Sequence, residues 1–306
     1  MNKKAVVFTF ITVILITLLI ASFLVNISNR AQRDIQKTNL KVGALSSFVN
    51  SLNNELLQEV LRSSSNQVFL AFLANIESNN QYIQGDMDVV FPEALMNGYY
   101  NNEELKVMFQ NNLNYTLGKS LDELKTLAQD HGAVFSYTAI NKNNIKVSQE
   151  DPWNLNISFV INYNLNDSRN DVSWNIENKK ISILLDIENY RDPFYLFEDQ
   201  LNKTITKTNV TTWTLSEFNM HIVNSLFRNH ADAPSFLKRL QGDKTSDANG
   251  IESILDSRIY GNGEFSNVDF EFWSNKNGEC RVTGMPSNFR LTAAHLTYYE
   301  QTGTCS

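Results

Sequence analysis

LNISFVINYNL, residues 155–165, has an apolar side chain at every second position and mostly polar side chains between them. Successive side chains of a β-strand point to opposite faces, so this two-residue period predicts a strand with one apolar and one polar face. Residues 181–187 repeat the pattern. Residues 133–140 and 171–177 are expected to be flanking strands, with turns at Asn178 and Lys179 or at nearby residues. One apolar face is typical of an antiparallel sheet whose other face meets solvent.

Helical patterns precede this sheet in the sequence. Apolar residues recur every three or four positions between residues 26 and 78, which predicts an amphipathic helical stalk. Residues 91–130 continue the helical pattern, with a capping box at Ser120 and Glu123 and a helix stop at Gly132. The apolar stripe of the stalk comprises Val42, Leu45, Val49, Leu52, Leu56 and Val60.

Short elements are predicted after the sheet. We expect helices at residues 216–227 and 235–240, and strands at residues 268–273 and 280–283. The order of helices, then a sheet, then further helices and strands predicts an α+β fold. In this fold an antiparallel sheet packs on helices, the stalk included.

The N-terminal sequence predicts a membrane anchor. Ala5 to Val25 are 21 residues without charge, Pro, Gly or His, and about 20 apolar residues match a hydrocarbon core of about 30 Å. A signal peptide is the alternative, but its apolar region is shorter, about 7–15 residues. The expected layout is a cytoplasmic tail (1–4), a transmembrane helix (5–25) continuing into the amphipathic stalk (26–78), and an external α+β domain (79–306), with a split near 192–214 as the alternative to one domain.

Two features predict that the chain beyond the anchor lies outside the cell. Cys280 and Cys305 are the only cysteines, and an even pair without CxxC spacing favours a disulfide in an oxidising compartment. Sequons for N-glycosylation belong on an external surface. Their candidate acceptors are Asn26, Asn114, Asn156, Asn166, Asn202 and Asn209. The predicted location is the cell membrane, single-pass, with the C-terminal domain extracytoplasmic.

No catalytic, cofactor-binding or metal site follows from the sequence motifs. The histidines form no HExxH motif, and GxSxG, Walker and GxGxxG motifs are absent. A formal net charge of −7 without a basic cluster argues against nucleic acid as a partner. The expected partners are the membrane and, through the N-terminal helix, other copies of the chain. The four histidines, His131, His221, His230 and His295, are widely separated and are expected to be partly exposed structural residues.

Lys4-Ala5-Val6-Val7 resembles the processing site of archaeal prepilins, the precursors of type IV pilin-like proteins. An N-terminal helix that is first apolar and then amphipathic, followed by a β-rich head, is similar to the layout of that class. The resemblance implies cleavage after Ala5 by a membrane peptidase and packing of the freed helices into a filament core. Residues 285–291 and 295–299 are similar to uncharacterised membrane-anchored surface proteins of archaea, which implies a location and no activity.

These features predict a single-pass surface protein that is not an enzyme. A minor pilin-like subunit and an adhesin are the two finer interpretations. The alternative is an anchored protein that binds or hydrolyses glycans, since flat aromatic rings offer stacking surfaces. Two carboxylates about 5–10 Å apart in one concave pocket would favour hydrolysis. The candidate stacking rings belong to Trp153, Trp174, Trp213, Trp273, Tyr99, Tyr100, Tyr298 and Tyr299.

Overall fold

The computed structural model describes residues 22, 26, 32–33, 35–168, 171–198, 203–260 and 263–306. The predicted processing pair, Lys4 and Ala5, lies outside these residues, as does the predicted anchor except for Ser22. Within the described residues, no helix has both the length and the apolar character needed to cross a membrane. The anchor therefore stays a prediction from sequence.

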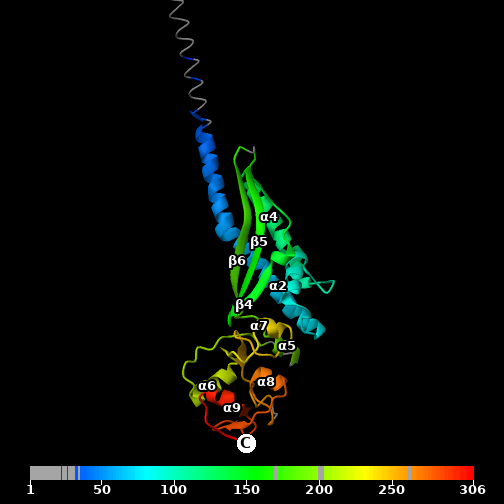
Figure 1. Cartoon of the computed structure of the whole chain (residues 1–306), viewed down its shortest axis with the longest axis vertical. Helices are drawn as coiled ribbons and strands as arrows, with labels where there is room; N and C mark the ends of the chain where they lie inside the picture. Colours follow the sequence, from blue (N-terminus) through cyan, green and yellow to red (C-terminus); the bar gives the residue numbers. More distant parts are fainter. Residues whose placement is uncertain are drawn as a thin grey trace, which may run out of the picture.

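An antiparallel sheet of four strands occupies the middle of the molecule (Figure 1). Its central strand is β5 (Asn154–Asp167), which pairs along most of its length with β6 (Ser173–Asp186). On its other side β5 pairs with β3 (Ala133–Tyr137) and β4 (Lys146–Asp151), one at each end. Every second residue of β5 from Leu155 to Leu165 is at most 2% exposed, so the predicted apolar face is confirmed. The α+β class is confirmed with it.

The turn expected at Asn178 and Lys179 is wrong, because both residues lie inside β6. The register between β5 and β6 shifts at this point, between Ile161 and Tyr163. Asn178 adopts a left-handed backbone, with φ of 52°, and its N–H donates to Asn162 Oδ1 at 2.6 Å. Asn tolerates this backbone better than most residues. Asn178, which was predicted to form a turn, therefore marks a β-bulge within β6.

A helical spine packs on the apolar face of the sheet. Residues 35–51 are helical, the π-helical turn η1 (Leu52–Leu56) follows, and α2 (Leu57–Asn79) continues the spine. The spine changes direction near η1, as expected where a π-turn inserts an extra residue (Figure 1). In the same turn, Asn53 Oδ1 accepts a hydrogen bond from the Tyr163 hydroxyl at 2.8 Å. The spine is therefore tied to the middle of β5.

The helical stretch expected from Phe91 to Asp130 is interrupted. α3 (Met87–Asn97) ends at Gly98, and β1 (Tyr99–Tyr100), β2 (Glu103–Glu104) and the 3₁₀ segment η2 (Lys106–Asn112) precede α4 (Leu117–Asp130). Gly98 adopts a left-handed backbone, with φ of 74°, and this conformation ends α3. Glycine adopts it without strain because it has no side chain. The predicted capping box is also wrong. Thr116 caps α4 by accepting from the Lys119 N–H, and Ser120 lies within the helix.

Short elements follow the sheet, below it in Figure 1. One of the two predictions made for residues 235–240 and 268–273 is confirmed and the other is wrong. The helix at 235–240 is present as α7, whereas residues 268–273 form a helix, α8, and not a strand. Apolar and acidic residues alternate in this stretch, which predicted a strand with one solvent-exposed face. The prediction fails because Asp269 and Glu271, between the apolar residues, are buried as well. The elements are α5 (Pro193–Glu198), α6 (Leu215–Val223), β7 (Phe227–Asn229), α7 (Phe236–Leu240), β8 (Ile251–Ser253), α8 (Asp269–Trp273), β9 (Cys280–Val282), β10 (Arg290–Leu291), α9 (Ala293–Tyr298) and β11 (Gly303–Cys305).

Buried apolar residues form two clusters. The larger cluster joins the spine, the four-stranded sheet and α7, and includes Phe69, Phe159 and Phe236. The smaller cluster lies among the short elements and includes Phe218, Phe289 and Tyr299. The clusters adjoin at α5, since Phe194 belongs to the smaller one and Tyr195 to the larger. The division of the chain into domains stays a prediction.

Candidate functional site

A cluster of buried carboxylates and histidines lies among the short elements after the sheet. Its central residue is Glu252, the middle residue of β8, whose side chain is fully buried. β8 pairs with β7 in antiparallel register, and His230 follows directly after β7. His295 lies in α9, and Glu271 lies in α8. Four short elements thus bring these side chains together from distant parts of the sequence.

The Glu252 carboxylate contacts three side chains. Its Oε2 atom lies 3.0 Å from His295 Nε2 and 3.2 Å from His230 Nδ1. Its Oε1 atom accepts a hydrogen bond from the Tyr299 hydroxyl at 2.7 Å. A buried carboxylate must be paired or hydrogen-bonded to offset the loss of hydration. Both oxygens of Glu252 have such partners.

The opposite side of the His295 ring faces a second carboxylate. His295 Nδ1 lies 2.7 Å from Thr292 Oγ1 and 3.4 Å from Glu271 Oε1. Glu271 also accepts hydrogen bonds from Ser266 at 2.7 Å and from Lys276 at 2.5 Å. The imidazole is therefore held between two carboxylates, one at each ring nitrogen.

This arrangement favours a positive charge on His295. Burial alone would lower the pKa of His295, but Glu252 and Glu271 outweigh burial and raise it to about 10. Burial likewise raises the pKa of Glu252, yet His230 and His295 bring it well below its usual range. The pKa of Glu271 is also lowered despite burial, through His295 and Lys276. The cluster stabilises a cation between two anions.

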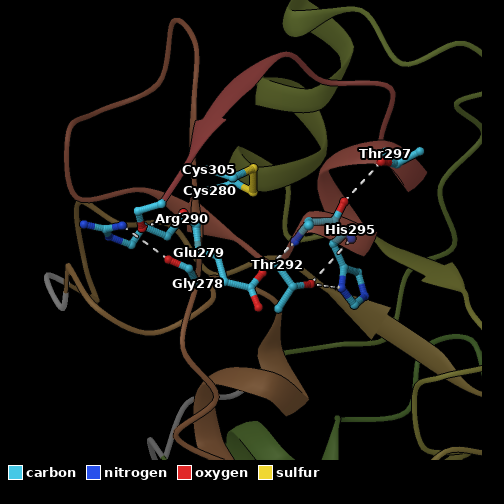
Figure 2. The surroundings of a disulfide bond; sticks show 10 residues. Gly278, Glu279, Cys280, Arg290, Thr292, His295, Thr297 and Cys305 are labelled. Atoms are coloured by element: carbon cyan, nitrogen blue, oxygen red, sulfur yellow. Dashed lines mark hydrogen bonds between the residues drawn. A yellow bond between two sulfur atoms is a disulfide. The ribbon is translucent and has the colours of Figure 1, made fainter.

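The disulfide predicted between Cys280 and Cys305 is present and supports α9. It joins directly opposite residues of β9 and β11, and β9 also pairs with β10, which leads into α9 (Figure 2). Next to the bridge, Glu279 accepts a hydrogen bond from the Ala293 N–H in the first turn of α9. The bridge and this contact together fix the helix that carries His295.

A second buried charge cluster lies beside the first. The Arg239 guanidinium, in α7, lies 3.0 Å from Asp192 Oδ2 and 3.0 Å from Asp269 Oδ2, and all three side chains are fully buried. Arg239 also donates to the carbonyl oxygen of Ile251. Ile251 precedes Glu252 in β8, and Asp269 is two residues before Glu271 in α8. Arg239 therefore positions both elements that supply the carboxylates around His295.

The histidine prediction was wrong in part. His131 is exposed, as expected, but His221 and His295 are buried, and His230 is brought to Glu252. Glu252 and His295 are 43 residues apart, so no local spacing could have indicated their contact. Arg239, Asp192 and Asp269 were missed for the same reason, since these partners lie 47 and 30 residues from Arg239.

The predicted glycosylation sites are spread over the chain. Asn26 and Asn209 are exposed, and Asn202 lies outside the described residues. Asn156 and Asn166 lie on the polar face of β5 and are half-buried, as is Asn114, which accepts hydrogen bonds from Thr116. Glycosylation at these residues stays a prediction.

The candidate stacking rings do not gather into one surface patch. Trp213, Tyr100 and Tyr299 are buried. Tyr99 is exposed, and the remaining candidates are half-buried: Trp153, Trp174, Trp273 and Tyr298. Glu103 and Glu104, the two residues of β2, both line one pocket of about 160 Å³ beside α2.

Comparisons with protein-family models, with curated proteins and with solved structures find no match for this chain.

His221 should make the protein less stable in mild acid. Its ring is buried against Trp213 and, in the described part of the chain, neither ring nitrogen has a hydrogen-bond partner. Burial lowers the pKa of His221 to about 3, below its usual 6.5. Below pH 6.5 the unfolded chain binds a proton that the folded chain does not, so the free energy of unfolding should decrease as the pH falls. One such group contributes a loss of about 2 kcal/mol between pH 7 and pH 5.

Urea unfolding at pH 7 and at pH 5 measures this contribution when the native protein is compared with His221→Phe, which keeps a buried ring without a titrating group. The native protein should lose about 2 kcal/mol more than the variant over this range. An identical pH dependence in both proteins would show that His221 is not held neutral in the fold.

Proposed function

We propose that this chain is a single-pass, membrane-anchored surface protein without enzymatic activity, whose sheet and distal elements are displayed outside the cell on a helical spine. The observation that carries the proposal is the uncovered start of the spine. Leu40 is 76% exposed and Ile35 is 60% exposed, whereas Leu45 and Leu52 further along the same helix are buried. Single exposed apolar residues are common on protein surfaces, but Ile35 and Leu40 follow the predicted anchor on one helix, which favours contact with the membrane or with another copy.

The sequence before the spine supports a membrane anchor. The uncharged stretch from Ala5 to Val25 precedes the exposed residues of the spine and has the length of a transmembrane helix. The disulfide between Cys280 and Cys305 supports an external location for the rest of the chain, because disulfides persist in oxidising compartments.

The buried charges support a structural role over an enzymatic one. Glu252, Glu271, Asp192 and Asp269 are all buried and paired with cations of the same chain. Catalytic carboxylates need access to substrate, and these four are occupied with holding elements together. The favoured role is therefore mechanical: to present a folded head at a fixed distance from the membrane.

A pilin-like subunit is the finer form of this proposal. The stripe residues Leu45, Val49 and Leu52 are covered by the chain's own sheet, so they are not free to contact a neighbouring copy. Ile35, Leu40 and Val42 are exposed. Contacts between copies would then involve the spine before residue 45, in line with helices that associate in a filament core.

The external location can be tested by labelling single cysteines in intact cells with a membrane-impermeant maleimide. Val89→Cys places a thiol on α3 at a residue that is 67% exposed, and both native cysteines are already in the disulfide. We expect this variant to be labelled in intact cells. Asn2→Cys, in the predicted cytoplasmic tail, is the control and should be labelled only after lysis. The reverse labelling pattern would contradict the orientation.

Contact between copies can be tested by oxidative cross-linking in native membranes. Leu40→Cys should form covalent dimers, because the proposal brings this part of the spine against the same part of another copy. Val89→Cys, exposed to a similar degree but on α3, should remain monomeric under the same oxidant. If Leu40→Cys also remains monomeric, the spine does not mediate self-assembly and the pilin-like form of the proposal fails.

A further inference from the structure

Three donor atoms converge between β7, β8 and α9. They belong to His230, Glu252 and His295, and all lie within 4.8 Å of one another. The Glu252 oxygen is 3.0 Å from His295 Nε2 and 3.2 Å from His230 Nδ1. We propose that these three residues bind a zinc ion, which links β8 and the residue after β7 to α9. This inference does not depend on the proposed surface function.

The spacing of the donor atoms fits a tetrahedral ion. Zinc bonds of about 2.0–2.2 Å at tetrahedral angles place neighbouring ligand atoms about 3.3–3.6 Å apart. The two separations from the Glu252 oxygen, 3.0 and 3.2 Å, are shorter by only a few tenths of an ångström. The three atoms all lie within 4.8 Å of one another, so rotation of the His230 ring towards His295 would bring them to bonding distance of one ion.

His230 supplies a donor atom that the protein itself leaves unused. Its Nδ1 atom is buried and has no hydrogen-bond partner among the described residues, although the Glu252 oxygen is close. In the tautomer whose Nδ1 carries no proton, the lone pair of this nitrogen faces those of the Glu252 carboxylate, and the two repel. A shared cation turns this repulsion into two bonds, and it satisfies a buried polar atom that is otherwise costly.

The surroundings resemble the supporting contacts of a metal site. A metal-bound histidine usually donates its other ring N–H to a carboxylate or another oxygen, which fixes the ring. His295 meets this requirement, because Nδ1 keeps its proton towards Thr292 and Glu271 while zinc replaces the proton on Nε2, the nitrogen that faces Glu252, and that proton is released to solvent. The second oxygen of Glu252 is likewise held by the Tyr299 hydroxyl. Two of the three ligands are therefore oriented before any ion binds.

The ligand set selects the kind of ion. Two imidazoles with one carboxylate suit zinc and related transition metals, whereas calcium and magnesium prefer oxygen ligands only. The third ligand, His230, is at the edge of the cluster, with its side chain 13% exposed and its ring 4.1 Å from that of Tyr298. An ion can reach the site along this edge, where a water molecule can supply the fourth ligand.

Metal binding is tested on the full-length chain, purified without a histidine tag and treated with EDTA before dialysis. Isothermal titration should show one zinc ion bound per chain, and magnesium at the same concentration should not bind. Cobalt(II) used as a spectroscopic probe should give the intense visible bands of tetrahedral coordination. Absence of stoichiometric zinc binding to the native protein would overturn the proposal.

Two histidine variants identify the ligands. His230→Ala removes the ligand at the edge of the cluster and leaves the Glu252–His295–Glu271 contacts in place, so the chain should still fold, as circular dichroism can verify. Its zinc affinity should fall at least about tenfold, in the range seen when one supporting group of a metal site is lost. His131→Ala, at an exposed histidine far from the cluster, should bind zinc as the native chain does. Equal affinity in both variants would locate the zinc elsewhere and overturn the assignment.

Discussion

The buried Arg239 guanidinium is the constraint on which the arrangement of the distal elements depends. Transfer of a charge into the protein interior costs several kcal/mol, and only close partners of opposite charge offset that cost. Asp192 and Asp269 supply these partners at 3.0 Å, and the carbonyl oxygen of Ile251 accepts a further hydrogen bond. These partners belong to the start of α5, α8 and β8. Displacement of any of the three would leave a charge or a polar atom buried without a partner.

The same constraint connects the sheet to the carboxylate–histidine cluster. Asp192 follows the end of β6 by six residues, and nearby Tyr190 donates a hydrogen bond to Asn66 in α2 at 2.6 Å. From Asp192 the charge network passes through Arg239 to β8 and α8, which hold Glu252 and Glu271. The position of His295 between these two carboxylates is thus determined through a chain of contacts that begins at the spine. Structural rigidity of this kind would suit the proposed display of these elements on the spine.

Sequence periodicity predicted the parts of the fold that local burial determines. The alternation at residues 155–165 predicted β5, and the stripe through Leu45 and Leu52 predicted the spine. Each pattern is local, because it depends on which face of a single element is buried. The pairing of Cys280 with Cys305 was also accessible, since no other cysteine competes. Local patterns failed where a polar residue has a special role. Asn178 forms a bulge and not a turn, and the acids of residues 268–273 are buried partners and not the solvent face of a strand.

The candidate site was not predictable in this way. His230, Glu252 and His295 come from three separate elements, and each is an unremarkable polar residue in its own local sequence. Their contact is a consequence of how β7, β8, α8 and α9 pack, which depends on pairings across 30 or more residues such as Arg239 with Asp269. A single sequence carries no periodic signal for such pairings.

Hydrogen exchange of the Arg239→Met variant tests the central role of this arginine most directly. Loss of one partner from a buried ion network costs about 3–5 kcal/mol, so amides in β8 and α8 should exchange more than about a hundredfold faster than in the native chain. Amides in β5 and β6 should keep their protection. Arg258→Met, which removes the ion pair of the exposed Arg258 with Asp256, is the control and should exchange like the native chain. Unchanged protection of β8 and α8 in Arg239→Met would contradict the account.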